Sequence, residues 1–484
     1  MTTTVPQPTV VVGGPAPAPS PATPRVAWRP VLLVAGGLAL VHGIASAWYG
    51  AFGDELYFLA AGHRAAYGYA DQPPLVPWLA AALDHLAPGN LVVLRLPATA
   101  ASAGHVVAAA LLAAEMGGRR GAQLVAAVAI TISPFFLATG HLLATSTIDP
   151  FLWAVLLWLV VRWLRTEQEG RGDDRLLLAA APVLALTLFG KFLVPVLLAG
   201  LAVGVLVAGP RRLFGRPALW VALVLAATST VPTLLWQAAH GWPQLRMGAV
   251  VAGEGDLTGN RWSFLPLAAW DVGLVPGLVL AGLGLWALLR ADALRPWRAI
   301  GIGAVVTVAA MLAVGGRPYY VMGLAAVLVA AGAVALQQRR PARWWGWTVS
   351  VPAFVASGLV VAVLALPLGP AHGGSSGGTS SPRGRSAGRA SPPTPPRPTG
   401  PCRPPSARTP PCSPSPTGTP RRSNATGPPG ACRRSTAATA GSGTSARPRT
   451  RPPPRSWSAR STGRGNSAAR SRRCPRTSIP RPTP

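Results

Sequence analysis

Apolar runs long enough to cross a membrane recur along most of this sequence, and they constrain the fold more than any other feature. A helix needs about 20 apolar residues to span a bilayer. Runs of this quality lie near residues 31–49, 92–116, 122–142, 150–165, 176–208, 218–236, 266–289, 298–315, 319–336 and 346–368. The segment 176–208 is long enough for two short spans, separated at the sequence FGKF. The pattern predicts an all-α, polytopic integral membrane protein with about eleven transmembrane helices.

Arginines in the short connections give this predicted bundle an orientation. They lie at Arg25/Arg29, Arg119/Arg120, Arg162/Arg165/Arg171/Arg175, Arg211/Arg212/Arg216, Arg290/Arg295/Arg298 and Arg339/Arg340/Arg343. Threading eleven spans puts all six clusters on one side, which the positive-inside rule identifies as the cytoplasm. The N-terminus is then inside, and the large first loop, residues 50–90, is extracytoplasmic.

Composition divides the chain into three parts. Residues 1–30 form a Pro-rich, almost uncharged leader without the basic start of a signal peptide, and we expect it to be disordered in the cytoplasm. Residues 31–370 form the membrane domain. All Asp and Glu residues of the chain precede residue 371, whereas residues 371–484 hold about twenty Arg and all four cysteines, Cys402, Cys412, Cys432 and Cys474. The membrane domain therefore offers no thiolate metal site or disulfide framework.

The tail, residues 371–484, is too rich in Pro, Arg, Ser and Thr to bury a core, so we expect it to be disordered. We interpret it as a frameshift product, because GC-rich coding DNA read out of frame yields this composition. A natural C-terminal domain would then be absent from this polypeptide. The alternative is a basic extension that binds anionic polymers of the cell wall. A nucleic-acid partner is not expected, because the topology exports the tail.

The remaining polar residues of the membrane domain fall on the predicted outer side. They are Asp54, Glu55, Asp71, Asp149, Lys191, His240 and Arg317, the last followed by Tyr319 and Tyr320. Ionisable groups at membrane depth are costly unless they are paired or hydrated, so they are candidates for a functional site.

Each candidate also has a structural interpretation. Asp54 and Glu55 could simply stabilise a helix N-terminus. Asp149 precedes Pro150 and could be a helix N-cap. Lys191 could extend to the membrane interface, and Arg317 with its two tyrosines could belong to an interfacial aromatic belt. His240 is most simply a loop residue.

Six short motifs, taken in order, resemble a known enzyme family. They are GDELYFL with GYADQPPLVPWL, LLATSTIDPFLW, LFGKFLVP, VPTLLWQAAHGWP and RPYYV, within about residues 30–340. In this order they resemble the GT-C glycosyltransferases, more narrowly the family 39-like group of protein O-mannosyltransferases and lipid A aminoarabinose transferases. The resemblance implies the GT-C fold and transfer of a sugar from a polyprenyl-phosphate donor to an acceptor hydroxyl on the outer face, with inversion.

The resemblance also implies a role for each candidate. Asp54 matches the catalytic aspartate, and Lys191 matches the lysine that contacts the donor phosphate, with Arg317 as a second contact. Glu55 and Asp149 match further acids of the catalytic cavity. The two tyrosines that follow Arg317, with Asp71 and His240, complete the expected substrate-binding set.

Several partners and functions stay open at this level. No metal or other cofactor is required by the motifs, although some members of the family use a divalent cation. The acceptor could be a protein, a lipid or a cell-wall glycan, and the sugar is undetermined. The expected location is the plasma membrane. The competing hypotheses are a transporter or lipid flippase, for which internal repeats would be expected, and an inactive member of the family.

Overall fold

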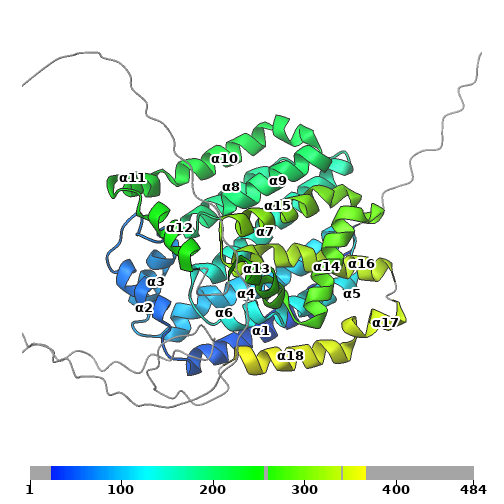
Figure 1. The fold of residues 1–484 in the computed structure, drawn as a ribbon, viewed down its shortest axis with the longest axis horizontal. Coiled ribbons are helices and arrows are strands. Elements are labelled where there is room, and N and C mark those ends of the chain that lie inside the picture. The colour runs from blue at the N-terminus through cyan, green and yellow to red at the C-terminus, as the bar shows by residue number, and fades with distance from the viewer. Residues whose placement is uncertain (1–22, 255–259, 340–341, 367–484) are drawn as a thin grey trace, which may run out of the picture. The chain divides into compact units, whose positions relative to one another are not determined.

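A computed structural model of the chain describes residues 23–254, 260–339 and 342–366, and all regular elements within these residues are helices (Figure 1). The α-helices are α1 (Trp28–Trp48), α2 (Gly53–Gly62), α3 (Leu75–Leu86), α4 (Leu91–Glu115), α5 (Arg120–Thr131), α6 (Pro134–Thr139), α7 (Thr145–Gln168), α8 (Arg175–Gly190), α9 (Val194–Ala208), α10 (Pro217–Ser229), α11 (Val231–Ala239), α12 (Pro243–Glu254), α13 (Asn260–Val272), α14 (Val275–Arg290), α15 (Arg298–Ala313), α16 (Ala325–Gln338), α17 (Arg343–Gly346) and α18 (Val351–Ala365). The 3-10 helices are η1 (Arg211–Gly215), η2 (Asp292–Trp297), η3 (Pro318–Leu324) and η4 (Trp347–Val349).

Six helical segments in the described part of the chain are long and apolar enough to cross a membrane, and the number rises to eight if two bent helix pairs each count as one span. Four further apolar helices are shorter: α3, α5, α8 and α9. The predicted all-α, multi-pass architecture is therefore confirmed. The count of eleven spans stays a prediction.

Two predicted spans are broken, and one predicted break is present. The run 122–142 divides into α5 and α6, because Pro134 lacks the N–H that a continuous helix would need. The prediction of a single helix for the run 266–289 was wrong, because α13 and α14 meet at an angle of 108°. The chain turns there at Gly273, whose φ of 157° suits glycine. The expected break at FGKF is confirmed, as α8 ends at Gly190 and α9 begins at Val194.

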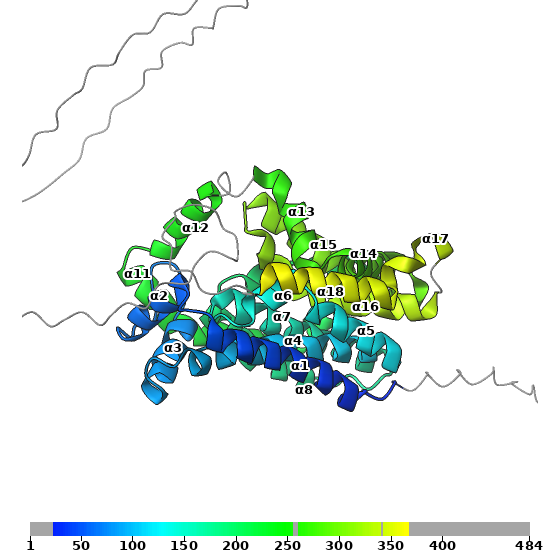
Figure 2. The same ribbon diagram turned by 90° about the horizontal axis from the view of Figure 1, so that it is seen from below.

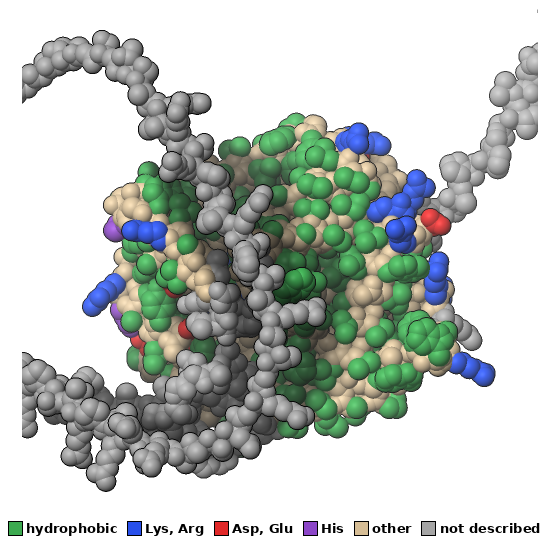
Figure 3. All heavy atoms as spheres, viewed as in Figure 1, with side chains coloured by type: hydrophobic (Ala, Val, Ile, Leu, Met, Phe, Trp, Pro, Cys, Tyr) green, Lys and Arg blue, Asp and Glu red, His purple; other side chains and the backbone are tan. Residues whose placement is uncertain are grey.

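Contacts between the Arg-rich connections hold them at one end of the bundle. The contacts are Gln123 Nε2 to the Arg25 carbonyl (3.2 Å), the Arg119 amide to Gln337 Oε1 (2.7 Å), Arg165 Nε to Glu115 Oε2 (2.6 Å), Arg216 Nη2 to Glu167 Oε2 (2.8 Å) and Trp297 Nε1 to the Val161 carbonyl (3.3 Å). On the face drawn in Figure 3, most Lys and Arg side chains gather at the end far from α2 and α3. The predicted clustering is confirmed for the described residues, which exclude Arg340.

The helices of the first loop, α2 and α3, lie at the opposite end together with α11 and α12 (Figures 1 and 2). The Tyr69 carbonyl of this loop accepts hydrogen bonds from Gln237 Nε2 (3.0 Å) and Gln244 Nε2 (3.3 Å). Gly68 also lies so close to the Trp236 ring that an added Cβ would be 2.6 Å from it. The sequence 50–90 is therefore ordered by contacts with a segment more than 160 residues away.

Small residues let the spanning helices approach closely. A Cβ added at Gly204 in α9 would overlap the Ala299 carbonyl of α15, and one added at Gly284 in α14 would overlap the Leu328 carbonyl of α16. Close backbone approach of this kind drives helix packing in lipid, where apolar side chains gain little from burial. The Gly and Ala content of the apolar runs is thus used for packing.

Two predicted parts lie mainly or wholly outside the described residues. The first is the leader, of which the structure describes only residues 23–30. The second is the tail, residues 371–484. Helix α1 begins at Trp28, inside the predicted leader.

Candidate functional site

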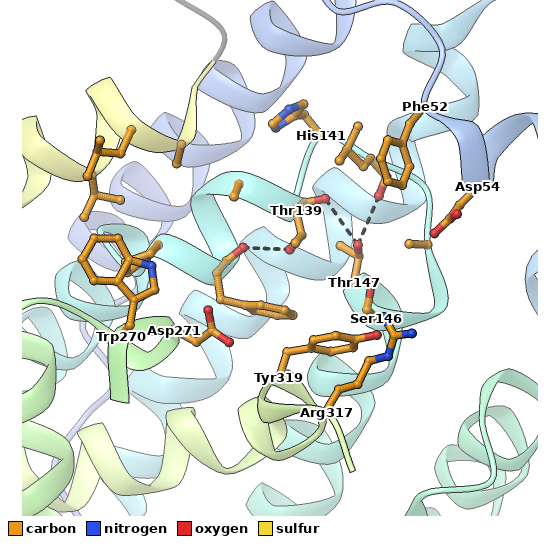
Figure 4. Close-up of a pocket in the computed structure, with 18 of the residues that line it drawn as sticks. Phe52, Asp54, Thr139, His141, Ser146, Thr147, Trp270, Asp271, Arg317 and Tyr319 are labelled. Atoms are coloured by element: carbon orange, nitrogen blue, oxygen red, sulfur yellow. Dashed lines mark hydrogen bonds between the residues drawn. The ribbon is translucent and has the colours of Figure 1, made fainter. Parts of the chain in front are cut away.

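A cavity of about 800 Å³ opens at the end of the bundle that holds the first loop. It lies among the connection from α1 to α2, the connection from α6 to α7, the last turn of α13, the start of η3 and one face of α18. Its charged and polar lining includes Asp54, His141, Asp271, Arg317 and Tyr319 (Figure 4). Three residues predicted from the sequence, Asp54, Arg317 and Tyr319, therefore line one cavity although they come from opposite ends of the membrane domain.

Asp54 is presented to the cavity by the first turn of α2. This helix begins at Gly53, so both Asp54 and Glu55 lie in its first turn, where the helix dipole favours negative charge. The Asp54 side chain is exposed, whereas the Glu55 side chain is fully buried. The two neighbouring acids consequently have different surroundings.

Glu55 is fixed by Arg95 of α4, inside the protein. Arg95 donates from Nε to Glu55 Oε1 (2.8 Å) and from Nη2 to Oε2 (2.7 Å). The backbone amides of Phe52 (2.9 Å) and Leu143 (3.0 Å) also donate to this carboxylate. Both side chains are fully buried, and their bidentate geometry is the strong form of this ion pair. Glu55 thus has four donors and joins α2 to α4 and to the connection before α7.

The guanidinium of Arg95 also orders the chain that leads into α2. Its Nη1 donates to the carbonyls of Ser46 (3.0 Å) and Tyr49 (3.0 Å), and its Nη2 donates to that of Gly50 (2.7 Å). These bonds fix the exit from α1 directly before Asp54. Arg95 was not predicted from the sequence, although a single arginine within the apolar run 92–116 is the kind of signal that marks a buried polar partner.

Lys191 lies next to the cavity wall, at the end of α8. Its Nζ is 4.0 Å from the ring centroid of Tyr320 and 5.2 Å from that of Tyr319, which are cation–π distances. Arg317 and Asp149 are both within electrostatic range of the Lys191 ammonium. The predicted cations and tyrosines are therefore brought together, with Tyr319 reaching the cavity.

Asp149 is buried in α7, with 6% of its surface exposed. The suggestion that it caps this helix was wrong, because α7 begins at Thr145 and Asp149 lies inside it. Within the described residues, its Oδ1 has no hydrogen-bond donor. Its charge faces Lys191, so this pair forms the inner part of the same polar region.

Comparison with known proteins gives one family match and two similar folds. The model of the family described as dolichyl-phosphate-mannose-protein mannosyltransferase matches residues 71–236. Two crystal structures of ArnT from Cupriavidus metallidurans are similar in fold, one bound to undecaprenyl phosphate and one in the apo state. The first has a TM-score of 0.52 and 18% identity, the second 0.51 and 20%, and each alignment covers 69% of this chain and 65% of the ArnT chain. No curated protein sequence matches this chain significantly.

The resemblance to the GT-C glycosyltransferases is confirmed. The fold similarity covers 69% of this chain, and the chain spans 65% of the length of either ArnT structure. The family match includes Asp71, Asp149 and Lys191, while Asp54 and Arg317 lie outside it. The cavity lining comes from both parts, since His141 lies within the match and Asp54 outside it.

Two predicted substrate-binding residues lie away from the cavity. Asp71 Oδ1 accepts a hydrogen bond from the Tyr57 hydroxyl (2.5 Å). The exposed His240 ring stacks on Trp236, with the centroids 4.0 Å apart, and its Nδ1 lies 2.7 Å from the Trp236 carbonyl. Both residues therefore shape the first-loop region, and contact with substrate stays a prediction for them.

Two ionisable groups that line the cavity were not predicted from the sequence, His141 and Asp271. Burial and the positive charge of Arg95 lower the pKa of His141 to about 4, so its ring is neutral at physiological pH. Asp271 is half-buried in the last turn of α13. The sequence feature that could have indicated Asp271 is an acid inside the apolar run 266–289. Among the described residues, no group of three His, Cys, Asp or Glu could hold a metal ion. The use of a divalent cation therefore stays a prediction.

Proposed function

We propose that this protein is a membrane glycosyltransferase that moves a sugar from a polyprenyl-phosphate donor to an acceptor hydroxyl. The single observation that carries the proposal is the cavity that brings the carboxylate of Asp54 and the guanidinium of Arg317 together, with the ammonium of Lys191 beside its Tyr319 wall. A base and a cluster of cations are the two components that this transfer needs. The ArnT structure with bound undecaprenyl phosphate supports a lipid-phosphate donor by analogy of fold.

In the proposed reaction, Asp54 accepts the proton of the acceptor hydroxyl as that oxygen attacks the anomeric carbon of the donor sugar. The bond between the anomeric carbon and the phosphate oxygen breaks, and the phosphate leaves with the electron pair. Arg317 and Lys191 stabilise the negative charge that develops on the phosphate. Attack from the side opposite the leaving group inverts the anomeric centre, in a single displacement.

Glu55 acts in this scheme through the backbone and not on the substrate. Its carboxylate already has four donors, so it has little capacity left for an acceptor hydroxyl. With Arg95 it holds the first turn of α2 in place, and Asp54 with it. Asp149 holds the ammonium of Lys191 from the inner side.

We further propose that the cavity faces the outside of the plasma membrane. The Arg-rich connections lie together at the other end of the bundle, and arginines of short loops favour the cytoplasmic side. A polyprenyl-phosphate sugar and an extracytoplasmic protein, lipid or glycan acceptor would then meet at the first loop.

The test is sugar transfer by membranes that contain the full chain, supplied with polyprenyl-phosphate mannose, glucose, arabinose and amino sugars. Asp54→Asn keeps the side-chain size but removes the base, and we expect transfer to fall by about 10²–10⁴-fold with unchanged membrane insertion. Asp84→Asn is the matched control, because Asp84 lies in the same loop region and contacts His63 and Gly89 instead of the cavity. Equal transfer by the Asp54→Asn protein and the wild type would reject the mechanism. A wild type that moves lipid without transferring sugar would favour a flippase.

A further inference from the structure

The carboxylate of Asp271 points into the cavity (Figure 4). Among the residues that the structure describes, none donates a hydrogen bond to this carboxylate or forms an ion pair with it. Only the backbone is held, since Ser133 Oγ donates to the Asp271 carbonyl (2.6 Å). A half-buried acid with an anchored backbone and an unoccupied side chain is a group prepared for a ligand.

The position of Asp271 is unfavourable for stability. It lies one residue before the end of α13, where the helix dipole opposes negative charge. Partial burial of a carboxylate without donors costs further free energy. The helix pair α13–α14 bends by 108° after Val272, and the last turn of α13 lines the cavity. No described residue donates to this carboxylate, so its cost is relieved either by a proton or by a polar group that enters the cavity from outside.

Trp270 supplies an aromatic surface beside this acid. Its side chain lines the same cavity and is 43% exposed, although the residue lies within helix α13 and in the apolar run 266–289. An aromatic ring offers a flat apolar face to the C–H groups of a sugar ring, while an adjacent carboxylate accepts hydrogen bonds from its hydroxyls. Neither feature alone indicates a sugar, but the two together match the two kinds of surface on a pyranose or furanose.

We propose that Trp270 and Asp271 form the subsite that holds the ring of the transferred sugar. This inference rests on the proposed function and adds two specificity-determining residues to it. Asp271 accepts hydrogen bonds from ring substituents, hydroxyl or ammonium, and Trp270 packs against one face of the ring.

The arrangement of the cavity supports the sugar over the other parts of the substrates. In an inverting displacement, the acceptor oxygen and the leaving phosphate lie on opposite sides of the anomeric carbon, so the rest of the ring projects away from that line. Figure 4 shows Asp54 and Arg317 toward one side of the cavity and Asp271 with Trp270 toward the other. A carboxylate would repel the donor phosphate and would be poorly placed beside an isoprenoid chain.

The experiment measures equilibrium binding of two kinds of lipid to the purified full-length protein. One is decaprenyl phosphate without a sugar, and the other is decaprenyl-phosphate mannose, glucose, arabinose or an amino sugar. We expect the wild type to bind at least one sugar-bearing lipid more tightly than the bare lipid. Asp271→Asn should weaken the binding of that sugar-bearing lipid by about ten-fold, the loss typical of a hydrogen bond to a charged group. The affinity for the bare lipid should change by less than about two-fold. Trp270→Leu should act in the same direction.

Asp292→Asn is the matched control, because Asp292 is an exposed acid at the other end of the bundle, and it should leave both affinities unchanged. Equal loss for both lipids in Asp271→Asn would overturn the proposal and assign Asp271 to the fold. Unchanged affinity in both Asp271→Asn and Trp270→Leu would overturn it as well. If the wild type bound the bare lipid but preferred no sugar-bearing lipid, only the subsite would be rejected. If it bound neither lipid, the proposed function would itself fail.

Discussion

The two ends of the helical bundle use ionisable residues in opposite ways. At the Arg-rich end, two acids with mostly buried side chains are paired: Glu115 contacts Arg165 (2.6 Å), and Glu167 contacts Arg216 (2.8 Å). At the cavity end, Asp149 and Asp271 have carboxylate oxygens without donors in the described protein. Paired charges connect helix ends, whereas acids left without donors indicate where a polar ligand binds.

The Glu55–Arg95 pair is the exception, because it lies at the cavity end but is fully satisfied and fully buried. It therefore belongs with the structural pairs by its chemistry and with the site by its position. Its burial makes it different from the exposed pairs of the Arg-rich end, such as Arg171 with Glu169. This difference gives the sharpest test of the comparison.

We expect Arg95→Met to give the largest loss of stability. Removing one partner leaves the Glu55 charge buried, which costs about 3–5 kcal/mol. Arg171→Met is the control, since exposed pairs contribute about 0–1 kcal/mol. The measurement is the midpoint of thermal unfolding in detergent. The double variant Arg95→Met with Glu55→Met should recover part of the loss, because neither charge then stays unpaired. Equal midpoints for Arg95→Met and Arg171→Met would remove the distinction between the two kinds of pair.

A smaller effect is expected for Lys191→Met. Loss of the ammonium beside Tyr319 and Tyr320 should weaken binding of decaprenyl phosphate by about ten-fold, as for other charge-assisted contacts. Arg212→Met is the control, because Arg212 is an exposed cation of the Arg-rich end. If Arg212→Met weakened binding as strongly, the lipid would be responding to the general positive charge of the protein. Lys191→Arg should retain most of the affinity.

The sequence was sufficient for those features that depend on local pattern. Apolar runs, the break at FGKF and the positions of the arginines required no knowledge of neighbours, and they predicted the all-α bundle and its Arg-rich end. Asp54, Arg317 and Tyr319 were also predicted for one site, and they line one cavity. That prediction came from the family motifs, because no rule of sequence spacing relates residues so far apart in the chain.

Features that depend on tertiary partners were not predictable. Nothing in the sequence near Glu55 indicates that Arg95, forty residues later, occupies its carboxylate. Hydropathy also cannot register a bend: residues 266–289 are apolar on both sides of Gly273, so the run predicted one helix. That error concealed Asp271, a residue of the last turn of α13 that lines the cavity.

The smallest expected effect concerns the first loop, where Tyr57 donates its hydroxyl proton to Asp71. Burial, this hydrogen bond and the charge of Asp71 raise the pKa of Tyr57. The folded loop therefore holds the phenolic proton more tightly than the unfolded loop does. The stabilisation is fully present below the unfolded pKa of about 10 and is lost as the pH rises above it. If the loop is held in this way, cleavage within residues 50–90 by an alkaline protease should accelerate above this pH. Tyr57→Phe should cleave about two- to ten-fold faster at neutral pH, the range of one net hydrogen bond, and should lose the pH dependence.

Tyr67→Phe is the matched control for this last comparison, since Tyr67 lies on the same loop and packs against Trp78 with its ring. This variant should keep the alkaline acceleration of the wild type. The same pH course in the Tyr57→Phe and Tyr67→Phe proteins would mean that the loop is held by other contacts, of which the bonds from Gln237 and Gln244 to the Tyr69 carbonyl are the strongest candidates. Loss of the pH dependence in Tyr57→Phe alone would establish Asp71 as a residue that orders the loop from outside the cavity, in contrast to Asp54 within it.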